Sequence, residues 1–108
     1  MSDHNILLDQ EGYLARYSDW SESVSHVFAK NIGLELTEAH WEIIHAMRSF
    51  YETFELSPAM RPFTKYVKQH LGQQKSSSLY LMSLFPGNGS PVKRIALLAG
   101  LPKPDNCL

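Results

Sequence analysis

The sequence has very little cysteine and no long apolar run, and each shortage excludes a class of protein. Cys107 is the only cysteine among 108 residues, so the chain cannot close an internal disulfide and is not a disulfide-stapled secreted domain. No apolar run approaches the roughly 20 residues of a membrane-spanning helix. The first residues lack the basic and apolar stretches of a secretory signal. We therefore expect a cytoplasmic protein without a membrane partner.

Sequence signatures of bound metals, nucleotides and hydrolytic enzymes are also missing. His40 and His45 are five residues apart, whereas a spacing of four places two metal ligands on one helix face. No Gly-rich phosphate loop follows a predicted strand, and no Ser-His-Asp or Cys-His arrangement is visible in the sequence. We predict no cofactor and no metal. We expect His40, close to a predicted helix start, to have a capping or packing role.

The apolar residues that are present predict a mainly α (α+β) fold. They make up 44% of the chain, which is enough for one modest core and argues against global disorder. Residues 5–16 contain two short apolar runs around Gly12, a pattern typical of a β-hairpin. Apolar spacings of three and four predict a small bundle of about five helices, over residues 18–32, 37–54, 57–71, 76–84 and 90–99.

Capping residues set the expected helix starts. Serine, threonine and aspartate accept hydrogen bonds from the free amides of the first turn, and proline is favoured at the first helical position. The expected starts are therefore Ser18 or Asp19, Thr37 or Glu38, Ser57-Pro58, Ser76 to Ser78, and Ser90-Pro91.

The last nine residues differ in character from the rest. Two prolines, Pro102 and Pro104, disfavour helix, so we divide the chain into a domain over 1–99 and a mobile C-terminal arm over 100–108. A single cysteine is most often a small buried apolar residue. The position of Cys107 on a polar, extended chain end instead favours an exposed, reactive thiol. Nine extended residues would reach roughly 28 Å.

Charge is distributed unevenly along the chain. Residues 1–56 carry ten acidic and three basic side chains, whereas residues 57–108 carry seven basic and one acidic side chain. Such asymmetry indicates either a basic surface near the thiol arm and an acidic one elsewhere, or two halves that attract one another within the fold.

Basic residues follow one face of the third predicted helix. Arg61, Lys65 and Lys68 are four and three positions apart, Lys75 follows Gly72, and Lys103 lies on the arm. Such a stripe is commonly a solvated face. It can also lower the pKa of a nearby thiol, bind RNA phosphate or bind an acidic partner. We treat these five residues as candidates for docking a partner or for holding an anionic sulfur group.

A set of short motifs, in order along nearly the whole chain, resembles the DsrC/TusE family. Each motif is weak alone, but the set ends in a penultimate cysteine and is specific. The motifs are Gly12-Tyr13-Leu14, Trp20, Leu36-Thr37-x-x-His40-Trp41, Arg48-x-Phe50-Tyr51, Ser57-Pro58-x-Met60-Arg61, Leu84-Phe85-Pro86-Gly87 and Ala99-Gly100-Leu101-Pro102-Lys103-Pro104-x-x-Cys107.

The resemblance implies a sulfur carrier with Cys107 as the reacting residue. Members with a sulfite-reductase role carry a second arm cysteine ten positions earlier, where this chain has Leu97. One-cysteine members resemble TusE, which accepts persulfide sulfur from a TusBCD complex and delivers it to the tRNA 2-thiouridylase MnmA. The resemblance therefore implies a carrier more than a turnover enzyme, with TusBCD-like and MnmA-like partners and with tRNA reached only through the thiolase.

Two other functions stay open from the sequence alone. A DsrC-like protein of sulfite or sulfur metabolism rests on family membership only. A nucleic-acid-binding regulator rests on the basic second half and on a helix–Gly72–helix arrangement that resembles a helix-turn-helix. The second helix of that arrangement is too apolar to read bases, so the motif is weak.

Overall fold

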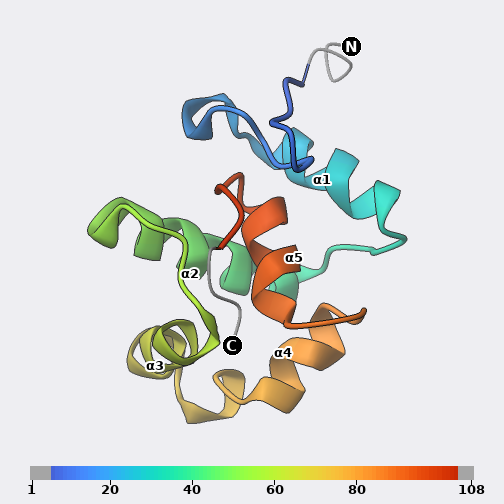
Figure 1. Cartoon of the computed structure of the whole chain (residues 1–108). Coiled ribbons are helices and arrows are strands. Elements are labelled where there is room, and N and C mark those ends of the chain that lie inside the picture. Colours follow the sequence, from blue (N-terminus) through green and yellow to red (C-terminus); the bar gives the residue numbers. More distant parts are fainter. Residues whose placement is uncertain (1–5, 105–108) are drawn as a thin grey trace.

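The computed structural model describes residues 6–104, which fold into one mainly helical unit, as the sequence predicts. Figure 1 shows α5 in the middle, with α1, α2 and α4 around it. None of the helices in this part of the chain is long and apolar enough to cross a membrane. The elements are η2 (Tyr17–Asp19), α1 (Glu22–Asn31), α2 (Glu38–Phe54), α3 (Met60–Leu71), η3 (Gln73–Lys75), α4 (Ser78–Leu84) and α5 (Pro91–Leu98).

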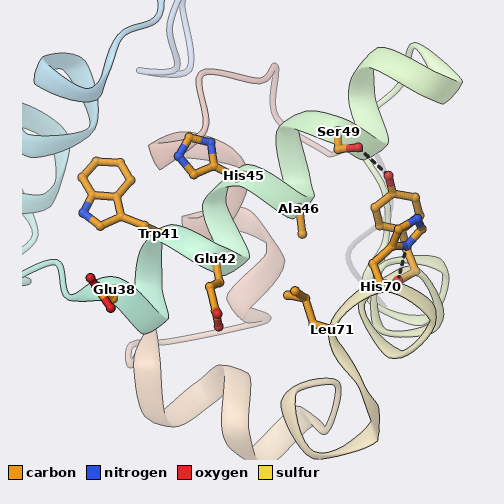
Figure 2. A pocket seen from close by; sticks show the side chains of 9 residues that line it. Glu38, Trp41, Glu42, His45, Ala46, Ser49, His70 and Leu71 are labelled. Atoms are coloured by element: carbon orange, nitrogen blue, oxygen red, sulfur yellow. Dashed lines mark hydrogen bonds between the residues drawn. The ribbon is translucent and has the colours of Figure 1, made fainter.

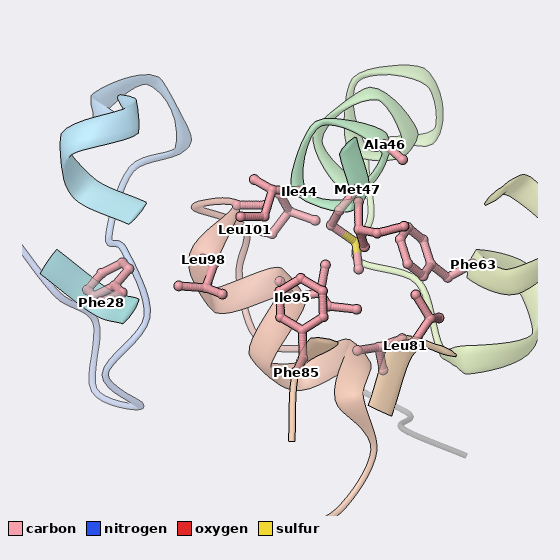
Figure 3. Packing of buried hydrophobic residues seen from close by; sticks show 14 of the residues in the cluster. Phe28, Ile44, Ala46, Met47, Phe63, Leu81, Phe85, Ile95, Leu98 and Leu101 are labelled. Atoms are coloured by element: carbon pink, nitrogen blue, oxygen red, sulfur yellow. The ribbon is translucent and has the colours of Figure 1, made fainter. Parts of the chain in front are cut away.

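The core gathers around α5, which contacts α1, α2 and α3. Ile95 and Leu98 of α5 are fully buried, as are Met47 of α2 and Phe63 of α3. Figure 3 shows Ile95 beside Met47 and Phe63, and Leu98 on the side of α5 that faces Phe28 of α1. Burial of a side chain of this size stabilises the fold by roughly 1.5–3 kcal/mol, so α5 holds the other helices together.

The predicted N-terminal hairpin is wrong as a pair of strands. Within residues 6–104 the region holds one antiparallel bridge, between Leu8 and Leu14, and no strand of regular length. The Asp9 carboxylate accepts hydrogen bonds from the Glu11 and Tyr13 amides, at 2.8 and 3.0 Å, and closes a tight turn. Leu14 packs into the core while Leu8 is half exposed. A two-stranded ladder on its own is only marginally stable. Here the packing of Leu14 into the core holds this region in place instead of a regular ladder.

Two helices start later than their capping residues predict. Asp19 pairs with Arg16 at 3.2 Å, and the chain stays extended at Trp20, so α1 begins only after Ser21. The Ser57 hydroxyl donates to the Pro102 carbonyl at 2.6 Å, so it is engaged elsewhere, and α3 begins at Met60. In both cases another contact, local for Asp19 and tertiary for Ser57, takes the group that local rules assign to a cap. The starts at Thr37, Ser77 and Ser90 are confirmed.

The structural role predicted for His40 is confirmed. Its Nδ1 accepts from the Thr37 amide at 3.1 Å, so the proton is on Nε2, which donates to the Leu84 carbonyl at 2.7 Å. The ring is buried and stands edge-on to Phe85, with 5.1 Å between the centroids. One side chain therefore connects the start of α2 to the end of α4.

Replacing His40 by alanine is expected to destabilise the fold by about 2–3 kcal/mol, because the Leu84 carbonyl and the Thr37 amide both lose a partner. Urea unfolding followed by circular dichroism measures the change. His70→Ala is the matched control: His70 is exposed, and its Nδ1 contacts only the Tyr66 carbonyl of its own helix, at 2.9 Å. Equal costs for the two variants would contradict the role assigned to His40.

Candidate functional site

The segment that leads to the thiol is anchored to the domain. We call residues 100–104 the arm root. Leu101 is fully buried, and its amide donates to the Ala96 carbonyl at 3.0 Å. The Pro102 carbonyl accepts from Ser57, and Lys103 Nζ lies 3.3 Å from the Glu11 carboxylate. The sequence predicts an arm free from residue 100, whereas the first five residues of that arm pack against the domain.

Gly100 allows the chain to leave α5 and turn back onto the core. Its φ is +78°, a left-handed conformation in which glycine is favoured. A Cβ at this position would lie 2.7 Å from Cδ1 of Trp20, so the indole occupies the space that any other residue would need. The glycine is thus required twice, for its backbone angle and for the close approach of the ring.

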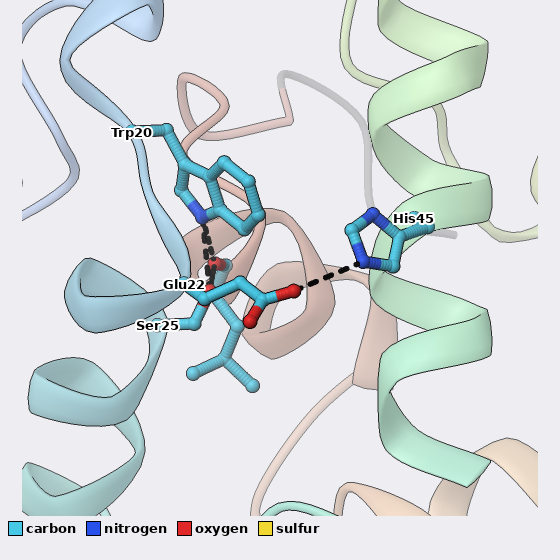
Figure 4. Close-up of polar contacts among 5 residues, drawn as sticks. Trp20, Glu22, Ser25 and His45 are labelled. Atoms are coloured by element: carbon cyan, nitrogen blue, oxygen red, sulfur yellow. Dashed lines mark hydrogen bonds and ion pairs between the residues drawn. The ribbon is translucent and has the colours of Figure 1, made fainter. Parts of the chain in front are cut away.

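Side chains from other elements bind the last carbonyls of α5. Trp20 Nε1 donates to the Leu98 carbonyl at 2.9 Å, and the buried Ser25 hydroxyl donates to the same oxygen (Figure 4). Arg48 NH1 donates to the Ala99 carbonyl at 2.8 Å. The last carbonyls of a helix have no partner within the helix, and a cation near that end is favourable. These contacts therefore hold the end of α5 where the arm root begins.

The Arg48 guanidinium is held between two aromatic rings. Its Cζ lies 3.9 Å from the Trp20 ring centroid and 4.1 Å from that of Tyr17, within the range of cation–π attraction. The Tyr17 hydroxyl donates to the Glu52 carboxylate at 2.9 Å. Burial lowers the pKa of Arg48, while burial followed by the Glu52 hydrogen bond raises the pKa of Tyr17 to about 12. Tyr17 is therefore neutral at physiological pH.

The basic residues predicted from the sequence fall into two groups. Arg61, Lys65 and Lys68 lie exposed on α3, and within residues 6–104 none of them makes an ion pair. Lys75 is paired with Glu42 at 2.7 Å, and Lys103 with Glu11. The two paired lysines have structural partners in the domain, so the exposed stripe on α3 is the more available surface.

Two shallow grooves border the arm root. One, of about 530 Å³, is lined by Pro102 to Pro104 and by the turn at 9–11. The other, of about 410 Å³, is lined by Pro102, Lys103 and the α2–α3 connection, including Leu56, which is 54% exposed. Asp9 and Glu11 line the first groove and Glu55 the second. The surroundings of the arm root are therefore partly acidic, and the basic charge lies along α3.

A third, more apolar groove lies between α2 and α3, with a volume of about 520 Å³. Figure 2 shows Trp41, His45 and Ala46 on α2 and Leu71 and His70 on α3. The hydroxyls of Tyr66 and Ser49, which also line the groove, are hydrogen-bonded at 2.6 Å. None of the predicted site residues lines it, although Lys75 pairs with Glu42 on its wall. Within the described residues, no three acidic, histidine or cysteine side chains gather to hold a metal.

The thiol itself lies outside the described residues, because Cys107 follows Pro104 by three positions. The thiol can be found from composition alone, whereas Trp20 and Arg48 stand out in the sequence only as parts of a family pattern, and Ser57 as part of that pattern and as a helix-capping residue. Their contacts with the end of α5 and with the arm root join residues 45 to 78 positions apart. The spacing of residues along the sequence does not predict contacts between positions so far apart.

The fold and the anchored root define a class of protein: a small helical domain whose C-terminal segment leads to a single cysteine. The chain belongs to the DsrC-like family, because the family model described as "DsrC like protein" matches residues 1–108.

Named relatives and solved structures agree with this family. The chain is 44% identical over 100 residues to "Sulfurtransferase TusE" of Yersinia pseudotuberculosis, covering 93% of this chain and 91% of that one. It is 43% identical over 103 residues to "Sulfurtransferase TusE" of Escherichia coli strain K12, covering 95% and 93%. The solution structure of Allochromatium vinosum DsrC is 48% identical, covers 94% of this chain and 88% of that one, and superposes with a TM-score of 0.82.

Proposed function

We propose that this chain is a cytosolic sulfur carrier in the 2-thiolation of the tRNA wobble uridine. The observation that carries the proposal is the 43–44% identity, over nearly the full length, to proteins named Sulfurtransferase TusE. A TusBCD-like complex would supply the sulfur, and an MnmA-like tRNA thiolase would receive it. The cytosol fits this role because its reducing conditions keep a lone thiol free.

The transfer uses the Cys107 thiolate and a persulfide on the donor. The thiolate attacks the outer sulfur of the donor persulfide, a new S–S bond forms, and the donor leaves as a thiolate. Cys107 then carries the persulfide. A thiolate of the recipient next attacks that outer sulfur, and Cys107 leaves as a thiolate. Neither step needs an external oxidant or a metal, and both depend on the thiolate fraction and on access.

Mass spectrometry of the protein after incubation with a persulfide-loaded donor tests this function. We expect the intact mass to rise by one sulfur atom, on the peptide that contains Cys107, and to return to its starting value when the recipient is added. No added sulfur, with the donor shown to be loaded, would overturn the proposal.

The single cysteine separates this function from that of a sulfite-reductase subunit. An oxidised DsrC of Archaeoglobus fulgidus, described as the gamma-subunit of dissimilatory sulfite reductase, is 32% identical and superposes with a TM-score of 0.78, so the fold alone does not discriminate. This chain has Leu97 where the two-cysteine members have their second arm cysteine, and an arm with one thiol cannot form a disulfide within itself.

The exposed stripe of Arg61, Lys65 and Lys68 is proposed as a docking surface for an acidic partner or for the persulfide. Reversing two charges in Lys65→Glu/Lys68→Glu is expected to lower the second-order rate of sulfur transfer by about tenfold at low salt, since opposite charge accelerates encounter. The difference should shrink as salt is raised. Lys30→Glu, at an exposed position in α1, is the matched control. Equal rates for the double variant and wild type at low salt would contradict the proposal.

A further inference from the structure

The arm root determines how far the thiol can reach. Cys107 is the seventh residue after Gly100, and a chain of seven residues spans at most about 25 Å. If the arm is held as far as Pro104, only three residues remain, and they span at most about 11 Å. The state of residues 100–104 therefore changes the accessible distance more than twofold.

The contacts that hold the root come from three separate places in the fold. Arg48 of α2 binds the Ala99 carbonyl, Ser57 of the α2–α3 connection binds the Pro102 carbonyl, and Trp20 packs on Gly100. Arg48 is the central member, because it also stacks against Trp20 at 3.9 Å. Loss of its guanidinium would remove the donor to Ala99 and one face of the contact that keeps Trp20 over Gly100.

We propose that Arg48 is a positioning residue for sulfur transfer, which holds the arm root against the domain so that only the residues after Pro104, with a span of at most about 11 Å, set the reach of Cys107. This inference rests on the proposed function and adds a geometric condition to it. The reacting sulfur of a donor or recipient must then approach the arm root itself. The partner would therefore contact the two grooves that border the root, lined by the turn at 9–11 and by Leu56.

Holding the root also raises the local concentration of the thiol at a docked partner. Effective concentration falls roughly as the −3/2 power of tether length, so a change from three to seven free residues lowers it by about fourfold. Loss of orientation adds to this cost. A small reagent in solution, in contrast, meets the thiol by ordinary diffusion and gains nothing from the anchor.

Arg48→Gln tests the inference, with Arg94→Gln as the matched control. Arg94 is a second partly buried arginine that binds carbonyls, but those of Phe85 and Asn88, at 2.8 and 2.7 Å, in a different loop. We expect Arg48→Gln to lower the transfer rate at saturating loaded donor by about tenfold, with the half-saturating donor concentration unchanged. Alkylation of Cys107 by iodoacetamide should change by less than about twofold. Arg94→Gln should leave both rates at the wild-type value.

Hydrogen exchange of the Leu101 amide gives a readout that does not depend on sulfur transfer. It should become faster in Arg48→Gln and not in Arg94→Gln, since this amide is bonded to the Ala96 carbonyl in the anchored root. Arg48→Lys keeps a donor for the Ala99 carbonyl, so its sulfur-transfer rate and its Leu101 exchange rate should lie between those of Arg48→Gln and of wild type. It also provides the test if Arg48→Gln fails to fold.

Two results would overturn the positioning role. One is an unchanged saturating rate in Arg48→Gln. The other is an alkylation rate that falls by the same factor as transfer, which would show an effect on thiol reactivity instead of position. Wild-type protein that accepts no sulfur would refute the proposed function, and the Leu101 exchange would still report whether Arg48 holds the root.

Discussion

Cells whose only copy of this protein is Cys107→Ser are expected to lose 2-thiouridine from their tRNA, down to the level of a strain without the protein. A serine hydroxyl does not form the thiolate that attacks a persulfide, and the chain offers no second cysteine to replace it. Nucleoside mass spectrometry of total tRNA measures the loss. Serine differs from cysteine by a single side-chain atom, so we expect the free energy of unfolding to change by less than about 0.5 kcal/mol.

Asn106→Ser is the control for the tail. It introduces the same side chain one position earlier and leaves the thiol in place, so thiolation should continue. Normal tRNA thiolation in the Cys107→Ser strain would refute the carrier function. If both tail variants lost thiolation, the sequence of the tail, and not its thiol, would be the required feature, and the chemical role of Cys107 would be refuted.

Gly100→Ala is expected to destabilise the fold by about 2–5 kcal/mol. A non-glycine residue in the left-handed region costs about 1–2 kcal/mol, and forcing a methyl group into packed surroundings adds about 1–3 kcal/mol. The methyl would lie 2.7 Å from Cδ1 of Trp20, whose ring is itself held by Arg48 and by the Leu98 carbonyl. The ring therefore cannot move away without breaking these contacts.

Gly89→Ala separates the two causes. Gly89 has the same φ of +78°, but nothing lies within 4 Å of the position that its Cβ would take. It should cost only the backbone term of about 1–2 kcal/mol. Urea unfolding of both variants gives the difference, which is the cost of the contact with Trp20. No difference between them would mean that the ring yields easily and that the arm root is held less firmly than its contacts indicate.

Charge counted along the sequence left two interpretations open: a basic surface near the thiol arm, or two halves that attract one another. At the arm root the structure shows the second. In the structure, Lys103 is paired with Glu11 of the first half, and Asp9 lies along the same groove. The fold brings the acidic N-terminal turn against the arm root, so part of the charge asymmetry is cancelled by pairing between the two halves.

The sequence alone determined most of the helical architecture and the single thiol on which the proposed function rests. Helix α2 follows from apolar residues at steps of three and four and from Thr37 and His40 at its start, all of which are local signals. The single thiol follows from composition. Such features depend on neighbours within about four positions, or on composition alone. They can therefore be recognised without knowledge of the fold.

Only the tertiary structure decided how the arm begins. Trp20, Arg48 and Ser57 lie on three different segments, and each has an ordinary local environment in the sequence. They meet at residues 98–102 because α5 packs between α1 and α2, which brings groups 45 to 78 positions apart into hydrogen-bonding distance. Side chains that bind the free carbonyls at the end of α5 and in the arm root are not available for local capping. Ser57 therefore does not cap the helix start that the sequence predicts.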